Sequence, residues 1–173
     1  MDKDSRYDET GLSAQVAIIG PGACTPDEYA AGRCIGRILA ENKAIVLCGG
    51  LGGVMEAACK GAWDREGTTV GIIPGAGGEN PYLTVVIRTD LGNARNAVIV
   101  QSADAVVAIG GAYGTLSEIA LALKMGKAVF GLRTWDIAGV ASCSSPEEAA
   151  FRALAAARRS PGCRIRQDGR APP

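Results

Sequence analysis

Six short apolar segments, separated by stretches of helical pattern, constrain the fold of this chain more than any other feature. Most of them are unbroken runs of valine, isoleucine and alanine, which is typical of strands buried on both faces of a parallel sheet. We therefore expect strands at 16–19, 44–48, 69–73, 84–87, 105–109 and 128–132.

Helical spacing fills the intervals at 26–41, 54–66, 93–102, 115–125 and 146–158. This alternation predicts an α/β fold, a Rossmann-like three-layer sandwich with a mainly parallel sheet and right-handed crossovers. Three helix starts place Ser or Thr at the cap and Glu three residues later, with Thr25, Thr115 and Ser145 as the predicted N-caps. Trp63 and Trp135 are expected to serve packing.

The chain of 173 residues is long enough for one domain with a buried core. We expect a single Rossmann-like ligand-binding domain over 13–159. The segments 1–12 and 160–173 lack periodicity and are expected to be flexible tails.

The chain balances 18 basic against 18 acidic residues, so it lacks the positive field that would hold nucleic acid or an anionic membrane. We expect neither partner. No cleavable leader and no apolar run of about 18 residues is evident, which favours a cytoplasmic protein. The absence of histidine excludes histidine-dependent nucleophilic catalysis and histidine-based zinc chemistry, and no metal site is predicted.

Three of the predicted strands end in glycine-rich turns, at 20–23, 49–53 and 110–114. Glycine permits positive φ and a close ligand approach, and the helix that follows offers unpaired N–H groups, so such turns suit a phosphate. A tight turn alone would explain any single one of them, but three at the ligand-binding edge of one sheet indicate an anion or nucleotide site. The candidate ligand-binding residues here are Gly20, Gly22, Gly49, Gly50, Gly52, Gly53, Met55, Gly110, Gly111, Tyr113, Gly114 and Thr115.

The turns do not match two common nucleotide-binding motifs. The first turn lacks the third glycine of the dinucleotide fingerprint, and Gly49 and Gly50 stand where a ribose-binding acid is expected, which disfavours NAD. No G-K-[ST] motif is present, which argues against a P-loop NTPase.

The segment 110–118, GGAYGTLSE, resembles the G-G-x-x-G-T-x-x-E signature of the superfamily that joins the LONELY GUY (LOG) phosphoribohydrolases with the molybdenum-cofactor carrier proteins. Members of this SLOG superfamily are often mislabelled lysine decarboxylases. The second glycine turn with Val54 and Met55 resembles its G-x-M segment. The stretch 91–96 looks closest to the carrier branch, and the resemblance extends roughly from Ala14 to Arg133.

In the LOG hydrolases, the arginine of an Arg-Lys pair and the signature glutamate are tied to cleavage. Arg95 and Glu118 match these positions and are the candidate catalytic residues, while Asn96 replaces the lysine and Ile109 replaces a proline. Arg95 and Asn96 also join the ligand-binding set. A guanidinium can hold a phosphate or ribose oxygen, and a carboxylate can stabilise an oxocarbenium-like centre. The alternative is that Glu118 only completes a helix cap at Thr115.

Two functions follow from this resemblance. The first is a carrier that binds a phosphorylated nucleotide-like or pterin molecule, with molybdopterin or the molybdenum cofactor as the carried ligand and no further cofactor. The second is a nucleoside 5'-monophosphate phosphoribohydrolase that releases free base and ribose 5-phosphate. The predicted helix 115–125 is apolar around much of its surface, and together with the resemblance this favours a homodimer or homotetramer.

Overall fold

The computed structural model describes residues 13–160, and the two predicted tails lie outside this range apart from Ser160. Its seven strands form one sheet in the order β4-β3-β2-β1-β5-β6-β7, and every neighbouring pair is parallel. The prediction of an α/β sandwich with a parallel sheet is therefore confirmed. The strands are β1 (Gln15–Ile19), β2 (Ile45–Cys48), β3 (Thr69–Ile73), β4 (Val85–Arg88), β5 (Ala105–Ile109), β6 (Ala128–Leu132) and β7 (Val140–Ser142).

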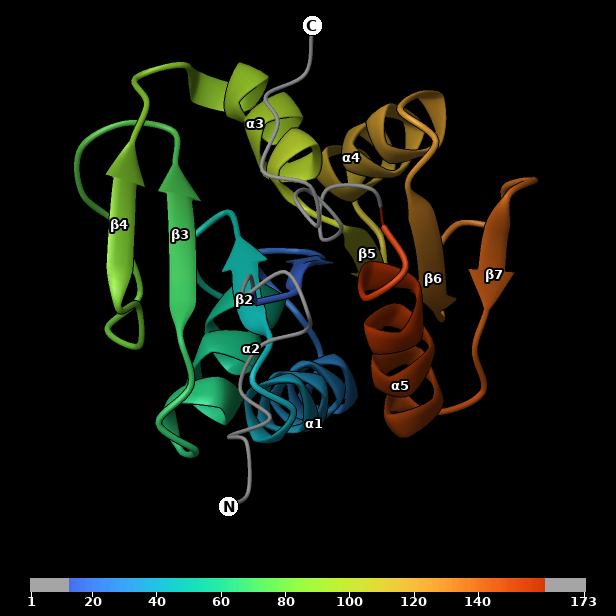
Figure 1. Ribbon diagram of the computed structural model, residues 1–173. Coiled ribbons are helices and arrows are strands. Elements are labelled where there is room, and N and C mark those ends of the chain that lie inside the picture. The colour runs from blue at the N-terminus through green and yellow to red at the C-terminus, as the bar shows by residue number, and fades with distance from the viewer. Residues whose placement is uncertain (1–12, 161–173) are drawn as a thin grey trace, which may run out of the picture.

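Helices cover both faces of the sheet, as Figure 1 shows. One face carries α1 (Pro26–Glu41), α2 (Val54–Trp63) and α5 (Pro146–Ala157). The other carries α3 (Arg95–Ser102) and α4 (Tyr113–Lys124). None of the helices between residues 13 and 160 is long and apolar enough to cross a lipid bilayer.

The alternation of side chains along the central strands builds the two apolar layers. In β1, Val16 and Ile18 pack toward α1, α2 and α5, whereas Ala17 and Ile19 pack toward α3 and α4. Successive residues of a strand point to opposite faces, so a strand buried on both faces must be apolar throughout. All five residues of β5 are buried in this way.

Close approach of α1 and α2 depends on two glycines at their crossing. A Cβ atom on Gly36 would overlap the carbonyl oxygen of Ala58, and a Cβ atom on Gly61 would overlap the carbonyl oxygen of Arg33. The two helix backbones therefore lie nearer to each other than larger residues would allow.

The structure differs from the sequence-based expectations at several element boundaries. It adds the three-residue edge strand β7, which is only partly buried and carries no strong apolar pattern. A 3-10 turn, Gly92–Ala94, precedes α3, which begins at Arg95. The helix α2 ends at Trp63 rather than at 66, because Glu66 adopts a positive φ. Trp63 and Trp135, which are expected to serve packing, are 49% and 37% exposed.

Candidate functional site

The chain order places a switch point between β1 and β5. After β1, the strands β2, β3 and β4 are added in sequence on one side of β1. The chain then crosses back, and β5 pairs with β1 on its other side. In open α/β sheets, ligands bind beyond the carboxyl ends of strands at such a point. The three glycine turns follow β2, β1 and β5, which are neighbours in the sheet, so they lie side by side at this edge as expected.

The turn after β2 has room for the guanidinium of Arg95 only because residue 49 is glycine. A Cβ atom on Gly49 would lie 2.6 Å from one terminal nitrogen of Arg95 and 2.9 Å from its Cζ. The next residue, Gly50, has a φ of +72°, in the region that favours glycine. The guanidinium therefore packs directly on the backbone of this turn.

Arg95 connects this turn to α3 and α4. One terminal nitrogen donates to Oδ1 of Asn96 and lies 3.6 Å from Oε1 of Glu118. The other donates to the carbonyl oxygen of Gly49 at 3.4 Å. Asn96 in turn donates through Nδ2 to Oγ of Ser117, at 3.0 Å. The two residues proposed for cleavage are thus brought together, and Asn96 joins them to α4.

The pair is buried, and burial shifts both groups toward their neutral forms. Arg95 is 8% exposed and Glu118 is 6% exposed. Burial raises the pKa of Glu118 to about 7, against the opposing effect of the positive charge of Arg95. Burial also lowers the pKa of Arg95, and here the charge of Glu118 opposes it. The carboxyl group of Glu118 is therefore poised between its two protonation states near neutral pH.

The predicted N-cap at Thr115 is wrong. The helix α4 begins at Tyr113 with Ala112 as its N-cap, because the backbone turns into the helix directly after Gly110 and Gly111. Thr115 is the third helical residue, is 2% exposed, and its Oγ1 has no hydrogen-bond partner among residues 13–160. Glu118 consequently takes no part in a helix cap. The caps predicted at Thr25 and Ser145 are confirmed.

The three helices that follow the glycine turns differ in what their N-termini can bind. Glu28 and Thr25 close a complete capping box on α1. In α2 the N-cap is Gly53, and Glu56 places a negative charge in the first turn. Within the described residues, α4 has neither a side-chain cap nor an acidic residue in its first turn. Its unpaired N–H groups and positive dipole end therefore form the most favourable anion site of the three.

The turn after β1 has the opposite electrostatic character. A Cβ atom on Gly110 would overlap Oε1 of Glu28, so this carboxylate lies at the crevice between β1 and β5. Burial raises the pKa of Cys24, which directly follows the turn after β1, and the charges of Glu28 and Glu56 raise it further. This side of the site suits hydroxyl or amino groups that donate hydrogen bonds, rather than a phosphate.

Two residues near the site were not among the predicted site residues. Asn80 is buried and donates through Nδ2 to the carbonyl oxygens of Gly50 and Leu51, at 3.2 and 3.1 Å, which fixes the turn after β2. Trp135 follows β6 and lies against Gly111, next to Tyr113. The position of Trp135 just beyond a predicted strand at the ligand-binding edge was a usable signal, whereas no local motif indicated the contacts of Asn80.

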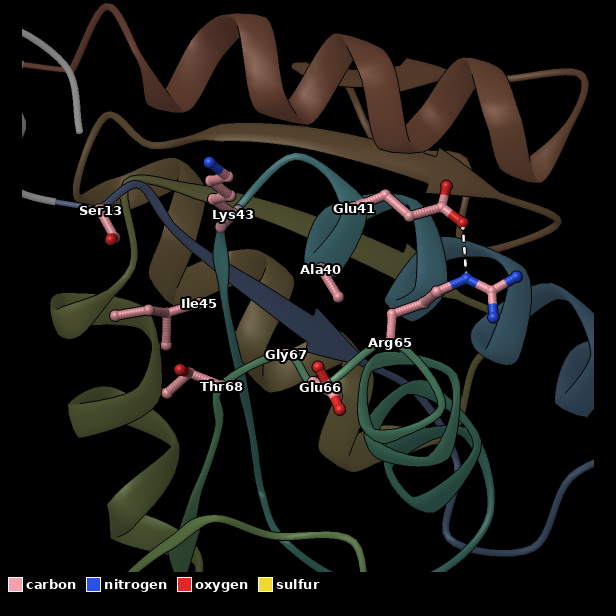
Figure 2. A pocket seen from close by; sticks show the side chains of 10 residues that line it. Ser13, Ala40, Glu41, Lys43, Ile45, Arg65, Glu66, Gly67 and Thr68 are labelled. Atoms are coloured by element: carbon pink, nitrogen blue, oxygen red, sulfur yellow. Dashed lines mark hydrogen bonds and ion pairs between the residues drawn. The ribbon is translucent and has the colours of Figure 1, made fainter. Parts of the chain in front are cut away.

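A cavity of about 560 Å³ lies at the opposite edge of the sheet. Figure 2 shows its lining, which includes Ile45 and Thr68 near the starts of β2 and β3. An ion pair between Arg65 and Glu41, 2.8 Å long, bridges α1 and the segment after α2 at its rim. This cavity is separate from the glycine turns, and amino ends of parallel strands are not where such sheets bind ligands.

Comparison with known proteins gives consistent similarities. The SLOG cluster4 family model matches residues 13–158. An uncharacterized protein of Archaeoglobus fulgidus is 44% identical over 137 residues, which cover 78% of this chain and 91% of that protein. The molybdenum cofactor binding protein of the phototrophic bacterium Rippkaea orientalis has a TM-score of 0.78 and 36% identity, covering 82% of this chain and 95% of its own. The molybdenum cofactor carrier protein of Chlamydomonas reinhardtii has a TM-score of 0.76 and 31% identity, covering 83% and 99%.

Proposed function

The chain belongs to the SLOG cluster4 family, and from this premise we propose that it is a carrier that binds a phosphorylated pterin or nucleotide-like molecule without converting it. The solved relatives that bind or carry the molybdenum cofactor make molybdopterin and the cofactor itself the first ligands to consider. In this proposal the ligand lies across the carboxyl ends of β1 and β5.

One observation carries the proposal: the N-terminus of α4, at the switch point of the sheet, has no side-chain cap within the described residues. Its first turn holds no acidic residue, and the buried Oγ1 of Thr115 in that turn has no partner among residues 13–160. Such an N-terminus binds a phosphate through several N–H groups and the helix dipole together. We assign the phosphate of the ligand to Gly111, Tyr113, Gly114 and Thr115.

Arg95 and Glu118 have a structural role in this proposal. Their contacts join the turn after β2 to α3 and α4, and both side chains are almost entirely buried. Nε of Arg95 is the one donor of its guanidinium that is buried without a partner in the described part of the chain. The pair therefore holds the turn after β2 and the turn after β5 at a fixed separation.

A charge placed in the first turn of α4 tests the proposal. Gly114 is exposed, and a Cβ atom there would meet nothing within 4 Å, so Gly114→Asp is expected to fold. Its carboxylate should repel a phosphate and weaken ligand binding by about tenfold or more, while Gly114→Asn, the neutral control, should bind far more tightly than the aspartate variant. Native mass spectrometry and thermal shifts with molybdopterin, AMP and GMP would measure this. Failure of all three ligands to bind the wild type would contradict the proposal.

A second candidate function rests on the pKa of Glu118. A carboxyl group that titrates at about 7 is suited to general acid–base catalysis at neutral pH, which the phosphoribohydrolase reaction uses. Incubation with AMP and N6-substituted relatives, followed by chromatography for free base, tests this function. Release of base that disappears in Glu118→Gln would support it, and release that survives this substitution would exclude the mechanism.

A further inference from the structure

An aromatic pair borders the proposed phosphate site at the carboxyl end of β6. The ring centroids of Tyr113 and Trp135 are 6.3 Å apart, and the ring planes are tilted by 31°. Tyr113 is the first residue of α4, and Trp135 follows β6, the strand that pairs with β5. Two segments that meet at the ligand-binding edge therefore bring the rings together.

Gly111 makes this arrangement possible. A Cβ atom at this position would lie 2.6 Å from Nε1 and 2.8 Å from Cδ1 of the indole, so the pyrrole edge of Trp135 lies directly against the backbone of the glycine turn. The indole is thus held at the same turn that leads into the N-terminus of α4. Any larger residue at 111 would push Trp135 away.

The exposure of these rings is unusual for the side chains involved. Tyr113 is 83% exposed and Trp135 is 37% exposed, although burial of an aromatic ring is favourable. A phosphate on the first-turn N–H groups of α4 would lie within one residue of Tyr113. Any planar ring attached to that phosphate therefore has an aromatic surface next to it.

We propose that Tyr113 and Trp135 form the binding surface for a planar fused heteroaromatic ring, a pterin or a purine, whose phosphate occupies the N-terminus of α4. This inference rests on the proposed function and adds the residues that select the ligand class. Stacking on aromatic side chains is worth about 5- to 150-fold in affinity per ring. A phosphorylated sugar without an aromatic ring gains nothing from this surface.

The tryptophan content of the chain provides a direct optical test. The chain has two tryptophans, and Trp63 ends α2, which runs back to the opposite edge of the sheet. Trp63→Phe therefore leaves Trp135 as the only tryptophan. Saturating GMP or molybdopterin should reduce the emission of Trp135 in this variant, and ribose 5-phosphate should bind, as followed by calorimetry, without this loss.

Substitution of Tyr113 gives the second readout. In the Trp63→Phe background, Tyr113→Ala should weaken GMP or molybdopterin binding about 5- to 150-fold and leave the affinity for ribose 5-phosphate unchanged. Tyr113→Phe should retain tight binding because it keeps the ring. Phe151→Ala, which removes an exposed ring from α5, is the matched control and should change neither affinity.

The binding results distinguish a failure of the aromatic surface from a failure of the proposed carrier function. If ribose 5-phosphate binds but GMP and molybdopterin bind no more tightly and leave Trp135 emission unchanged, the aromatic surface is overturned and the phosphate site stands. If neither the sugar phosphate nor the ring-bearing ligands bind, the proposed function fails, and the inference fails with it.

Discussion

At the scale of single residues, the buried carboxyl group of Glu118 couples the site to pH. Its pKa rises from an ordinary value of 4.5 to about 7 in the folded protein, so the folded state binds this proton more tightly than the unfolded state does. The free energy of unfolding should therefore fall as pH rises from 4.5 to 7, by about 3 kcal/mol from this group alone. About one pH unit above this pKa the contribution should no longer change.

Glu118→Gln removes the titrating group and keeps the shape of the side chain. Urea unfolding of the wild type and the variant at several pH values between 4.5 and 7.5 measures the effect. The stability of the wild type should decline relative to that of the variant across this window. Parallel pH profiles, or a relative gain by the wild type with rising pH, would show that folding does not raise the pKa of Glu118.

Gly49 gives a second prediction at this scale. In Gly49→Ala the new methyl group would lie 2.6 Å from the guanidinium of Arg95, so the guanidinium must move away from the turn. We expect a loss of about 1–3 kcal/mol in unfolding free energy, together with weaker ligand binding. Gly75→Ala is the control, since its nearest neighbour, Oδ1 of Asp90, would be 3.9 Å away. Equal stability of the two variants would argue against a tightly packed Arg95.

At the scale of secondary-structure elements, the crossing of α1 and α2 depends on Gly36 and Gly61. An alanine at either position would force the two backbones apart, because its methyl group would overlap a carbonyl oxygen of the other helix. Each substitution should lower the unfolding free energy by about 1–3 kcal/mol. Gly114→Ala, also within a helix but facing open space, should raise it by up to about 1 kcal/mol. Thermal denaturation of the three variants would reveal this difference in sign.

The elements that could be predicted from sequence are those in which local and tertiary preferences agree. The strand over 105–109 is apolar throughout and buried throughout, and the helix over 26–41 carries its own capping box, so both have the predicted bounds. The start of α4 could not be predicted in the same way. The Thr-x-x-Glu pattern at Thr115 imitates a capping box, but the glycines before it let the helix begin two residues earlier. The contacts of Asn80 could not be predicted because its partners are 30 and 29 residues away in the chain.

At the scale of the whole molecule, the sheet order brings distant glycine turns and one ion pair to a single edge. Arg95 and Glu118 could be selected from sequence through their motif, but their contact depends on how α3 and α4 pack against the sheet. The carboxylates of Glu28 and Glu56 make the side of this edge near the turn after β1 acidic, and in our proposal the phosphate occupies the other side, at the N-terminus of α4. No single sequence motif predicts this distribution of charge, because the charged residues come from different helices.

This division predicts the orientation of the ligand. A phosphorylated molecule should place its phosphate at α4 and its hydrogen-bond donors toward the turn after β1. Because such a ligand binds only the folded protein, it should also raise the melting temperature, by an amount that grows with the logarithm of its concentration above Kd.

A crystal structure of the protein with bound molybdopterin or GMP tests this account most directly. The account predicts phosphate oxygens within hydrogen-bond distance of the first-turn N–H groups of α4, beyond the carboxyl ends of β1 and β5. A phosphate bound elsewhere, for example in the cavity lined by Lys43 and Arg65 at the opposite edge of the sheet, would contradict it.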